Sequence, residues 1–297
     1  MSVNKSKCGY IAIVGRPNVG KSTLLNCLLK QKISITSDKP QTTRQRILGI
    51  KTEDNVQAIY VDTPGIHKKA KRALNRYMNR AAASMLFDVD VIIFMVDARV
   101  WTDEDELVLK KLRSTERPVI LALNKVDLIK EKKKLLPTLQ KVSEKMNFIE
   151  IIPLSVLKET NVQKLEAIAL KFLPEAAYFF SDEAITDRDD KFLISEIVRE
   201  KIMRVTGQEV PYDTTVMVET FKYKEKVLHL DVVIWVERRG QKIIIVGSKG
   251  EKMKEIGKKA RLDIEKLFNC KVFLTLWVKI KEGWSDNEKT LIRLGYD

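Results

Sequence analysis

The segment from Gly15 to Ser22 constrains the fold of this 297-residue chain more than any other feature. It reads GRPNVGKS and matches the pattern GxxxxGK[ST], in which the backbone N–H groups of a glycine-rich loop surround phosphates. An apolar run at 10–14 precedes the loop, and a helical pattern begins at Thr23. A strand, this loop and a helix in that order predict an α/β domain with a phosphate site where its first strand ends.

Each position of the loop has a predicted role in holding a nucleotide. Lys21 is expected to reach the β- and γ-phosphate oxygens, and the Ser22 hydroxyl is a candidate ligand for Mg²⁺. The following helix adds its positive end to the same site. The predicted nucleotide-binding residues of the loop are Gly15, Arg16, Pro17, Asn18, Val19, Gly20, Lys21, Ser22 and Thr23.

A second motif, Asn124-Lys125-Val126-Asp127, indicates that the base is guanine. The Asp127 carboxylate can accept both N–H groups on the Watson–Crick edge of guanine, a pattern that adenine cannot supply. Asn124 is expected to bond the purine and brace the phosphate loop, while the Lys125 stem covers the ring. Farther along, backbone N–H groups at Ser155 and Val156 are expected near guanine O6.

Two further loops are predicted to respond to the γ-phosphate. The strand 56–61 ends in Asp62-Thr63-Pro64-Gly65, where the aspartate can hold Mg²⁺ through water and Gly65 can offer its N–H to the γ-phosphate. Upstream lies Gln41-Thr42-Thr43-Arg44, in which Thr43 is preferred over Thr42 as an Mg²⁺ ligand. The predicted metal ligands are Ser22, Thr43 and Asp62, and the predicted catalytic residues are Asn18, Lys21, Thr43 and Gly65.

The residue after Gly65 is Ile66, where many GTPases carry a glutamine that orients the attacking water. Hydrolysis is therefore expected to be slow, or to use another group or an ion. One hypothesis is that the Asn18 amide helps to hold K⁺ over the phosphates. The alternative is that Asn18 only braces the loop.

The rest of the first half fits one doubly wound domain. The expected strands are 89–96, 118–123 and 148–153, and the expected helices are 104–112, 131–146 and 161–173. Residues 1–173 are assigned to this domain. Residues 174–190, which include Pro174 and several acids, are assigned to a linker.

Residues 191–297 predict a second domain that grips nucleic acid. A helix at 192–205 and strands at 216–221, 227–236 and 242–246 precede Gly247-Ser248-Lys249-Gly250, which opens a helix at 251–268 before a strand at 272–280. This layout is that of a KH domain, whose GxxG loop clamps about four nucleotides of a single strand. The predicted RNA-binding residues are Gly247, Ser248, Lys249, Gly250, Lys252, Lys254 and Lys258, with an apolar floor at 243–246.

The distribution of charge agrees with two modules. The chain carries 54 Lys and Arg against 40 Asp and Glu, a net charge of +14. Residues 1–180 hold 31 basic and 19 acidic side chains, and residues 222–281 hold 16 and 7, while the stretch between them is acidic. The longest apolar run, Val91–Val96, is far shorter than the ~20 residues of a membrane span, and the three cysteines show no metal-site spacing. A soluble protein of the reducing cytosol is expected.

With both modules placed, the chain closely resembles the Era family of bacterial GTPases over essentially its whole length. The resemblance is carried by the four nucleotide motifs, by 184–201 and by VERRGQKIIIVGSKGEKMKEIG at 236–257. It implies a P-loop GTPase domain with a mixed sheet followed by a type II KH domain. It also implies a monomeric GTPase that uses GTP, GDP and Mg²⁺, binds the 3′ end of 16S ribosomal RNA and the 30S subunit during assembly, and in some members associates peripherally with the inner membrane. Val156 and Thr160 depart from the family pattern.

Three rival functions leave part of the sequence unexplained. A small-molecule kinase would need an acceptor lid and gives no role to 124–127. A GTPase that modifies transfer RNA would need a further catalytic domain. An RNA-binding scaffold that keeps GTP as a structural ligand shares all the motifs, and only a hydrolysis assay separates it from a switch.

Overall fold

The structure is a computed structural model that describes residues 6–37, 39, 42–64, 73–74, 76–78, 88–131, 133, 135–207 and 210–294. Its contacts divide the chain into two compact units. The first unit comprises Met1–Ser34, Thr43–Ala70 and Asn75–Asp187, and the second comprises Ile35–Thr42, Lys71–Leu74 and Arg188–Asp297.

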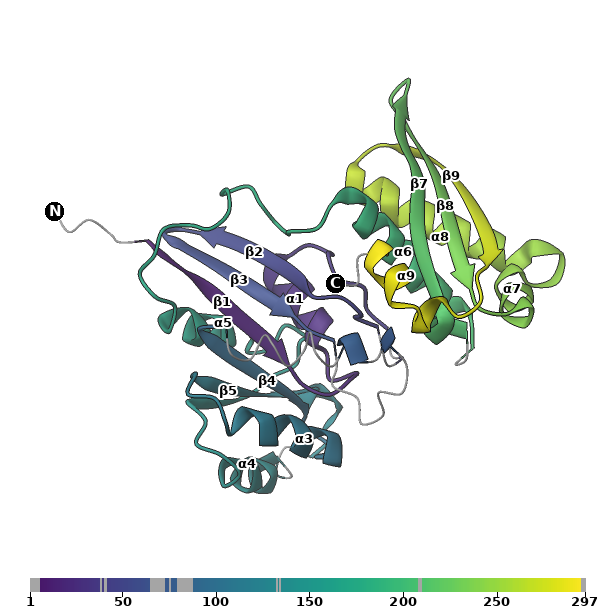
Figure 1. Cartoon of the computed structure of the whole chain (residues 1–297). Coiled ribbons are helices and arrows are strands. Elements are labelled where there is room, and N and C mark those ends of the chain that lie inside the picture. Colours follow the sequence, from purple (N-terminus) through teal and green to yellow (C-terminus); the bar gives the residue numbers. More distant parts are fainter. Residues whose placement is uncertain are drawn as a thin grey trace. The chain divides into compact units, whose positions relative to one another are not determined.

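The first unit is built on a six-stranded mixed sheet with the order β2-β3-β1-β4-β5-β6 (Figure 1). The strands are β1 (Lys7–Val14), β2 (Ile47–Glu53), β3 (Val56–Asp62), β4 (Val91–Asp97), β5 (Val119–Asn124) and β6 (Glu150–Pro153). β2 pairs antiparallel with β3, and the other four pairs are parallel. β1 lies between β3 and β4, so the strand order reverses there, and ligands of such sheets bind at the carboxyl ends of the strands at this point.

Helices cover both faces of this sheet. They are α1 (Lys21–Leu29), α3 (Asp103–Leu112), α4 (Leu135–Ser143) and α5 (Val162–Lys171). α3 and α4 contribute Val108, Leu109 and Val142 to the buried cluster on one face. α1 packs on the other face so closely that a Cβ on Gly49 would lie 2.6 Å from Leu25 Cδ1. The predicted doubly wound architecture is confirmed.

Residues assigned to the linker form hydrogen bonds with the first unit. Ala176 N–H donates to Ser6 O at 3.1 Å, and Ile50 N–H donates to Ile185 O at 2.8 Å. The side-chain oxygen of Gln57 accepts from the N–H groups of Phe179 and Phe180 at 2.9 and 3.0 Å. The aromatic run is therefore anchored to the sheet as far as Asp187, where the first unit ends.

The second unit has the element order of a type II KH domain. Its main elements are α6 (Asp190–Val205), β7 (Thr214–Lys224), β8 (Val227–Val236), α7 (Arg239–Val246), α8 (Glu251–Phe268), β9 (Lys271–Ile280) and α9 (Glu288–Arg293). β8 pairs antiparallel with β7 and parallel with β9 (Figure 1). The core lies between this sheet and the apolar sides of α6 and α8, which contribute residues such as Ile197 and Ile256.

The predicted strand at 242–246 is wrong, because these residues form the second half of α7. A run of β-branched residues is ambiguous between strand and buried helix, and here only Ile245 of α7 is buried. The topology decides the matter. Because β9 runs parallel to β8, the chain must cross over between them, and such crossovers are usually helical.

Two smaller differences concern the first unit. The helix predicted at 131–146 begins at Leu135 and ends at Ser143. Pro137 explains the late start, because proline is tolerated in the first turn of a helix and breaks the bonding of an interior turn. The edge strand β2 was not predicted, although it borders the predicted switch loop.

Candidate nucleotide and nucleic-acid sites

The phosphate loop lies between β1 and α1, as predicted, and two of its glycines are required by geometry. Gly15 and Gly20 have φ values of +152° and +108°. A Cβ on Gly15 would lie 2.4 Å from Met95 O, and one on Gly20 would lie 2.5 Å from Asn124 Nδ2. Side chains are thus excluded where the loop passes β4 and the guanine motif.

Lys21 is buried and points into the loop. Its ammonium donates to Gly15 O at 3.0 Å and to Arg16 O at 2.9 Å. Burial lowers the pKa of Lys21 to about 8, although the nearby Asp62 carboxylate opposes the shift. A buried cation held by neutral carbonyls is a favourable site for an anion, which fits phosphate.

The three predicted metal ligands converge on one point. Ser22 Oγ lies 2.7 Å from Asp62 Oδ2 and 2.8 Å from Thr43 Oγ1, and Thr43 Oγ1 lies 3.3 Å from Asp62 Oδ2. Thr42 turns elsewhere, donating through its hydroxyl to Lys39 O at 2.6 Å.

One oxygen of the Asp62 carboxylate is available for a further ligand. Its Oδ1 is buried and has no hydrogen-bond partner among the residues that the structure describes. Burial raises the pKa of Asp62, while Lys21 and the hydroxyl donors around it act in the opposite direction. Two hydroxyls and a buried carboxylate are hard oxygen ligands, so the residues fit Mg²⁺.

The guanine motif is braced against the phosphate loop. Asn124 Nδ2 donates to Val19 O at 2.7 Å, and Lys125 Nζ donates to Asn18 O at 2.7 Å. Lys125 has a left-handed backbone, and the exposed Asp127 lies in the short 3₁₀ turn Val126–Leu128 that follows. The two motifs, more than 100 residues apart, therefore form one site.

The N–H groups expected near guanine O6 already have partners in the protein. Ser155 N–H donates to Thr160 O at 3.2 Å, and Val156 N–H donates to Asn124 Oδ1 at 3.0 Å. Contact with a base would share or replace one of these bonds. Thr160 N–H also donates to Ser155 O, so Thr160 contributes to this turn through its main chain.

Two acidic residues that support the site were missed from the sequence. Asp97 ends β4 and lies 3.1 Å from Lys125 Nζ and 2.7 Å from Arg99 Nη2. Burial alone would raise the pKa of Asp97, but hydrogen bonds from Arg99 and Lys125 outweigh it and hold the pKa well below its ordinary value. On α3, the buried Asp105 accepts from Arg16 Nε at 3.0 Å. Asp97 could have been predicted from its position at the carboxyl end of a buried strand next to β5.

Part of the loop at 62–65, which is also predicted to respond to the γ-phosphate, is described by the structure. Thr63 is buried, and its hydroxyl donates to Ile13 O at 3.2 Å, while Pro64 follows it at the edge of the described chain. Gly65, Ile66 and Gln41 lie outside the described residues.

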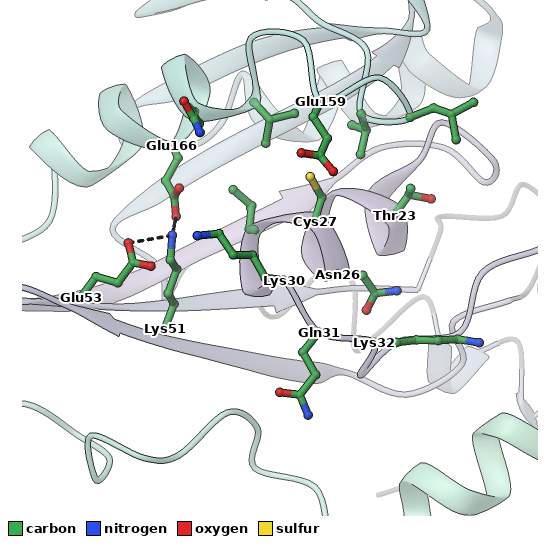
Figure 2. A pocket seen from close by; sticks show the side chains of 15 residues that line it. Thr23, Asn26, Cys27, Lys30, Gln31, Lys32, Lys51, Glu53, Glu159 and Glu166 are labelled. Carbon is green, nitrogen blue, oxygen red and sulfur yellow. Dashed lines mark hydrogen bonds and ion pairs between the residues drawn. The ribbon is translucent and has the colours of Figure 1, made fainter. Parts of the chain in front are cut away.

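A cavity of about 790 Å³ lies beside the nucleotide motifs (Figure 2). It reaches the predicted nucleotide-binding residues at Thr23 and Val156. At its other end Lys51 Nζ lies 2.8 Å from Glu166 Oε1 and 3.1 Å from Glu53 Oε2, as the dashed lines in Figure 2 show. One ammonium lies between two carboxylates, so these three groups together carry a formal charge of −1, which does not favour an anion at that end.

In the second unit, the GxxG loop opens α8 as predicted, but it follows the helix α7 and not a strand. Gly247 and Gly250 have φ values of +72° and +80°, and Lys249 between them is also left-handed at +48°. A Cβ on Gly247 would lie 2.8 Å from Lys252 Cγ. The loop therefore exposes backbone where a strand of nucleic acid can approach.

A groove of about 430 Å³ lies next to this loop and is lined by Arg239, Lys242, Ile243, Val246, Gly247 and Ile280. Arg239 and Lys242 were missed, because 242–246 was expected to be a strand. The apolar floor predicted at 243–246 is instead one side of α7 together with β9. Ile243 is 63% exposed, which leaves it free to contact a base.

The predicted lysines do not form one cluster. Lys252, Lys254 and Lys258 are all exposed on α8. At about 100° per residue, Lys254 lies roughly 160° around the helix from Lys252, whereas Lys254 and Lys258 share a side. The tryptophans also differ, since Trp284 is fully buried but Trp277 is 56% exposed rather than in the core.

Among the described residues, no helix is long and apolar enough to cross a membrane. In the same part of the chain, no group of three or more His, Cys, Asp or Glu side chains could hold a metal ion. The convergence at Ser22, Thr43 and Asp62 is a different type of site, because two of its three ligands are hydroxyls.

Comparisons with known proteins agree with this geometry. The chain matches the family described as 50S ribosome-binding GTPase over residues 10–125 and the KH domain family over residues 209–285. GTPase Era of Marinobacter nauticus is 57% identical over 291 residues, covering 98% of this chain and 95% of the relative. GTPase Era of Pseudomonas putida is 57% identical over 293 residues, covering 99% of this chain and 98% of the relative.

Two solved structures are similar over nearly the whole chain. One is a variant of Aquifex aeolicus Era bound to GDP and AlF4⁻, and the other is Era in complex with MgGDPNP and nucleotides 1506–1542 of 16S ribosomal RNA. Each is 41% identical with a TM-score of 0.94, covering 98% of this chain and 99% of the other. The motifs, the two folds and these relatives together show that the chain is a GTP hydrolase belonging to the Era family of GTPases.

Proposed function

We propose that this GTPase binds the 3′ end of 16S ribosomal RNA through its KH domain and acts as a nucleotide-controlled switch in assembly of the 30S subunit. The observation that carries the switch is the convergence of Thr43 with Ser22 and Asp62. Thr43 belongs to the loop between α1 and β2, so a ligand in this place links that loop to the nucleotide.

The nucleotide site has a role for each group of residues. The loop 15–23 surrounds the phosphates, Lys21 contacts the β- and γ-phosphates, and 124–127 with 155–156 select guanine. Ser22, Thr43 and Asp62 hold Mg²⁺, which supplies charge neutralisation at the phosphates. Thr63, Pro64 and Gly65 complete the phosphate side, with the Gly65 N–H directed to the γ-phosphate.

Binding of RNA is proposed for the GxxG loop and the groove beside it. The support is the solved Era complex with nucleotides 1506–1542 of 16S ribosomal RNA, together with the groove that pairs cations with an apolar floor. Gly247, Ser248, Lys249 and Gly250 clamp the backbone of a single strand, and Lys252 lies beside them. Lys254 and Lys258 supply longer-range attraction from the solvent side of α8.

For hydrolysis, the proposal assigns Asn18 to a K⁺ site that replaces part of the charge of an arginine finger. Asn18 has φ +64° and lies at the exposed tip of the phosphate loop. Exchange of Na⁺ for K⁺ in the buffer is expected to accelerate single-turnover hydrolysis. Equal rates in the two salts would remove the K⁺ site and leave Asn18 as a brace.

The proposal also takes its cellular setting from the family resemblance. The protein acts as a monomer in the cytoplasm, with peripheral association with the cytoplasmic face of the inner membrane. Residues 1–173 act as the GTPase domain, 174–190 as the connection and 191–297 as the KH domain.

The central experiment measures the affinity for RNA of nucleotides 1506–1542 in protein loaded with a non-hydrolysable GTP analogue and in protein loaded with GDP, alongside single-turnover hydrolysis of GTP with and without this RNA. A switch predicts that the RNA binds differently to the protein loaded with a GTP analogue and with GDP. Equal RNA affinity in the two nucleotide states would favour a scaffold that only holds GTP.

A further inference from the structure

The segment just before Thr43 groups with the second unit rather than with the nucleotide fold. We call Ile35–Thr42 the switch segment, of which residues 35–37, 39 and 42 are described. Its contacts place it with Arg188–Asp297, whereas Thr43, the next residue, groups with the nucleotide unit. A single peptide bond therefore joins the segment to a predicted Mg²⁺ ligand.

Helix α6 has a side devoted to this segment. The apolar residues Ile194, Ile197, Val198 and Ile202 of α6 face the KH core. Arg199, Glu200 and Arg204 lie elsewhere on the helix, and each contacts the switch segment. The cluster of buried apolar residues that forms the KH core does not include these three polar residues.

Glu200 is the centre of the contact. Its side chain is fully buried, and its Oε1 accepts from the Thr36 N–H at 3.2 Å, the Thr36 hydroxyl at 3.4 Å and Arg204 Nη2 at 2.8 Å. Its Oε2 accepts from Lys201 Nζ at 3.0 Å. A buried carboxylate is costly unless its oxygens accept hydrogen bonds, and departure of Thr36 would remove two of the donors to Glu200.

Lys39 binds the carboxyl end of the same helix. Its ammonium donates to the carbonyls of Met203 and Thr206, and to Gly207 O at 3.2 Å. The last carbonyls of a helix have no intrahelical donors and carry its partial negative charge. Lys39 therefore caps α6 from outside the helix.

The third contact adjoins the metal site. Arg199 is held by Glu196 through bonds of 2.7 and 2.6 Å, and its Nη2 donates to the carbonyl of Thr42. This carbonyl belongs to the peptide bond that leads to Thr43. Fixing this carbonyl restricts the conformation of the peptide unit that leads to Thr43.

We propose that the carboxyl half of α6 is the receptor of the switch segment, and that Glu200, with Lys39 and Arg199, is a positioning residue that holds Thr43 in place for Mg²⁺·GTP. The inference rests on the proposed metal role of Thr43. It gives the KH domain an influence on the nucleotide site, because a shift of α6 also shifts the switch segment, which one peptide bond joins to Thr43.

The test compares the full-length chain with Lys39→Met and Glu200→Gln. Affinities for GDP and for a non-hydrolysable GTP analogue are measured by equilibrium titration over a range of Mg²⁺ concentrations. We expect each variant to bind the GTP analogue about tenfold more weakly, as for loss of one charge-assisted hydrogen bond, and to need more Mg²⁺. GDP affinity is expected to stay within about twofold of the wild type, because GDP lacks the γ-phosphate that orders the loop.

Lys30→Met is the matched control, since Lys30 is an exposed lysine outside both the switch segment and the nucleotide motifs. It should leave the GTP-to-GDP preference unchanged. Glu200→Gln removes a buried charge and can weaken folding of the KH domain, so its melting temperature is measured alongside. Lys39→Met changes a residue outside the KH core, so this variant still tests the proposal if Glu200→Gln weakens folding.

Thr43→Ala separates the possible failures. If Thr43→Ala raises the Mg²⁺ requirement but Lys39→Met and Glu200→Gln do not, the role of α6 is overturned. If those two variants instead bind the GTP analogue more tightly, α6 restrains the segment against GTP, and the proposal is equally overturned. If Thr43→Ala itself changes nothing, the metal assignment fails, and the inference fails with it.

Discussion

The phosphate loop and the GxxG loop both contain two glycines with positive φ values, yet they are supported in different ways. Around the phosphate loop, the supporting side chains are buried and come from distant parts of the chain, as Asn124 and Asp105 do. Around the GxxG loop, the supporting cations are exposed and come from the two adjoining helices.

This difference bears on how each site recognises its ligand. A buried, fully bonded site can reject a ligand that lacks one donor, because a polar group would then remain unsatisfied. An exposed site gains from charge in a graded way and depends on salt. We therefore expect a single substitution to cause a large loss of affinity in the nucleotide site, and only a partial loss of affinity in the groove beside the GxxG loop.

The largest expected effect concerns the nucleotide site. Asp127→Asn should weaken GTP binding by about 10⁴-fold and shift the preference to xanthosine triphosphate, because an amide cannot accept both guanine N–H groups. Asp54→Asn, an exposed acid with a positive φ that asparagine tolerates, is the matched control. Titration with both nucleotides measures the change, and unaltered GTP affinity would show that the base lies elsewhere.

The next effect concerns the clamp. Ser248→Asp combined with Lys249→Asp should lower the affinity for RNA of nucleotides 1506–1542 by about 100-fold or more and spare GTP binding, because two carboxylates would face the phosphates. The control is Lys224→Asp with Lys226→Asp in the β7–β8 turn. Equal losses in fluorescence anisotropy titrations of both variants would mean that net charge, not the loop, holds the RNA.

A smaller effect divides the lysines that the structure separates. Arg239→Met with Lys242→Met, in the groove, should weaken RNA binding by about 30-fold and reduce its salt dependence. Lys254→Met with Lys258→Met removes the same charge from the solvent side of α8 and should cost about threefold. If the α8 variant lost more affinity for RNA than the groove variant, the binding surface would lie on α8 and the assignment of the groove would be wrong.

The smallest effect uses pH to distinguish the buried cation from the exposed ones. Burial lowers the pKa of Lys21 to about 8, and phosphate should raise it again, so affinity for GTP should fall about tenfold between pH 7 and pH 9.

The same pKa shift has the opposite consequence for nucleotide-free protein. Unfolded Lys21 stays protonated up to its ordinary pKa of about 10.4, so between pH 8 and that value the unfolded state binds more protons and folding stability gains with pH. Lys21→Met should abolish this gain when thermal unfolding is compared with the wild type. A wild-type affinity for GTP that does not change with pH would contradict the burial of a titrating ammonium.

The sequence allowed the nucleotide site to be predicted in detail, because each motif combines a fixed spacing with a specific chemistry. Thr43 was preferred over Thr42, and the structure brings Thr43 to Ser22 and Asp62. Asp97 was missed because it belongs to no motif. Its relevance arises from the pairing of β4 with β5, which places it opposite Asn124.

The groove beside the GxxG loop was harder to predict for a related reason. The residues at 242–246 are apolar and β-branched, so local pattern alone could not distinguish a strand from a helix. The parallel pairing of β8 with β9 required a crossover, and the helical form of α7 placed Arg239 and Lys242 on the groove.

The sequence by itself determined the two modules, the nucleotide that the first one uses and the loop that we propose as the RNA clamp, because those predictions depend on glycine, lysine and carboxylate at short fixed spacings. The tertiary structure alone decided which cations share a groove, which acids hold the motifs and which helix holds the switch segment. These contacts join residues up to about 170 positions apart, such as Lys39 and Thr206, so no local spacing encodes them. They exist only once burial has brought the elements together.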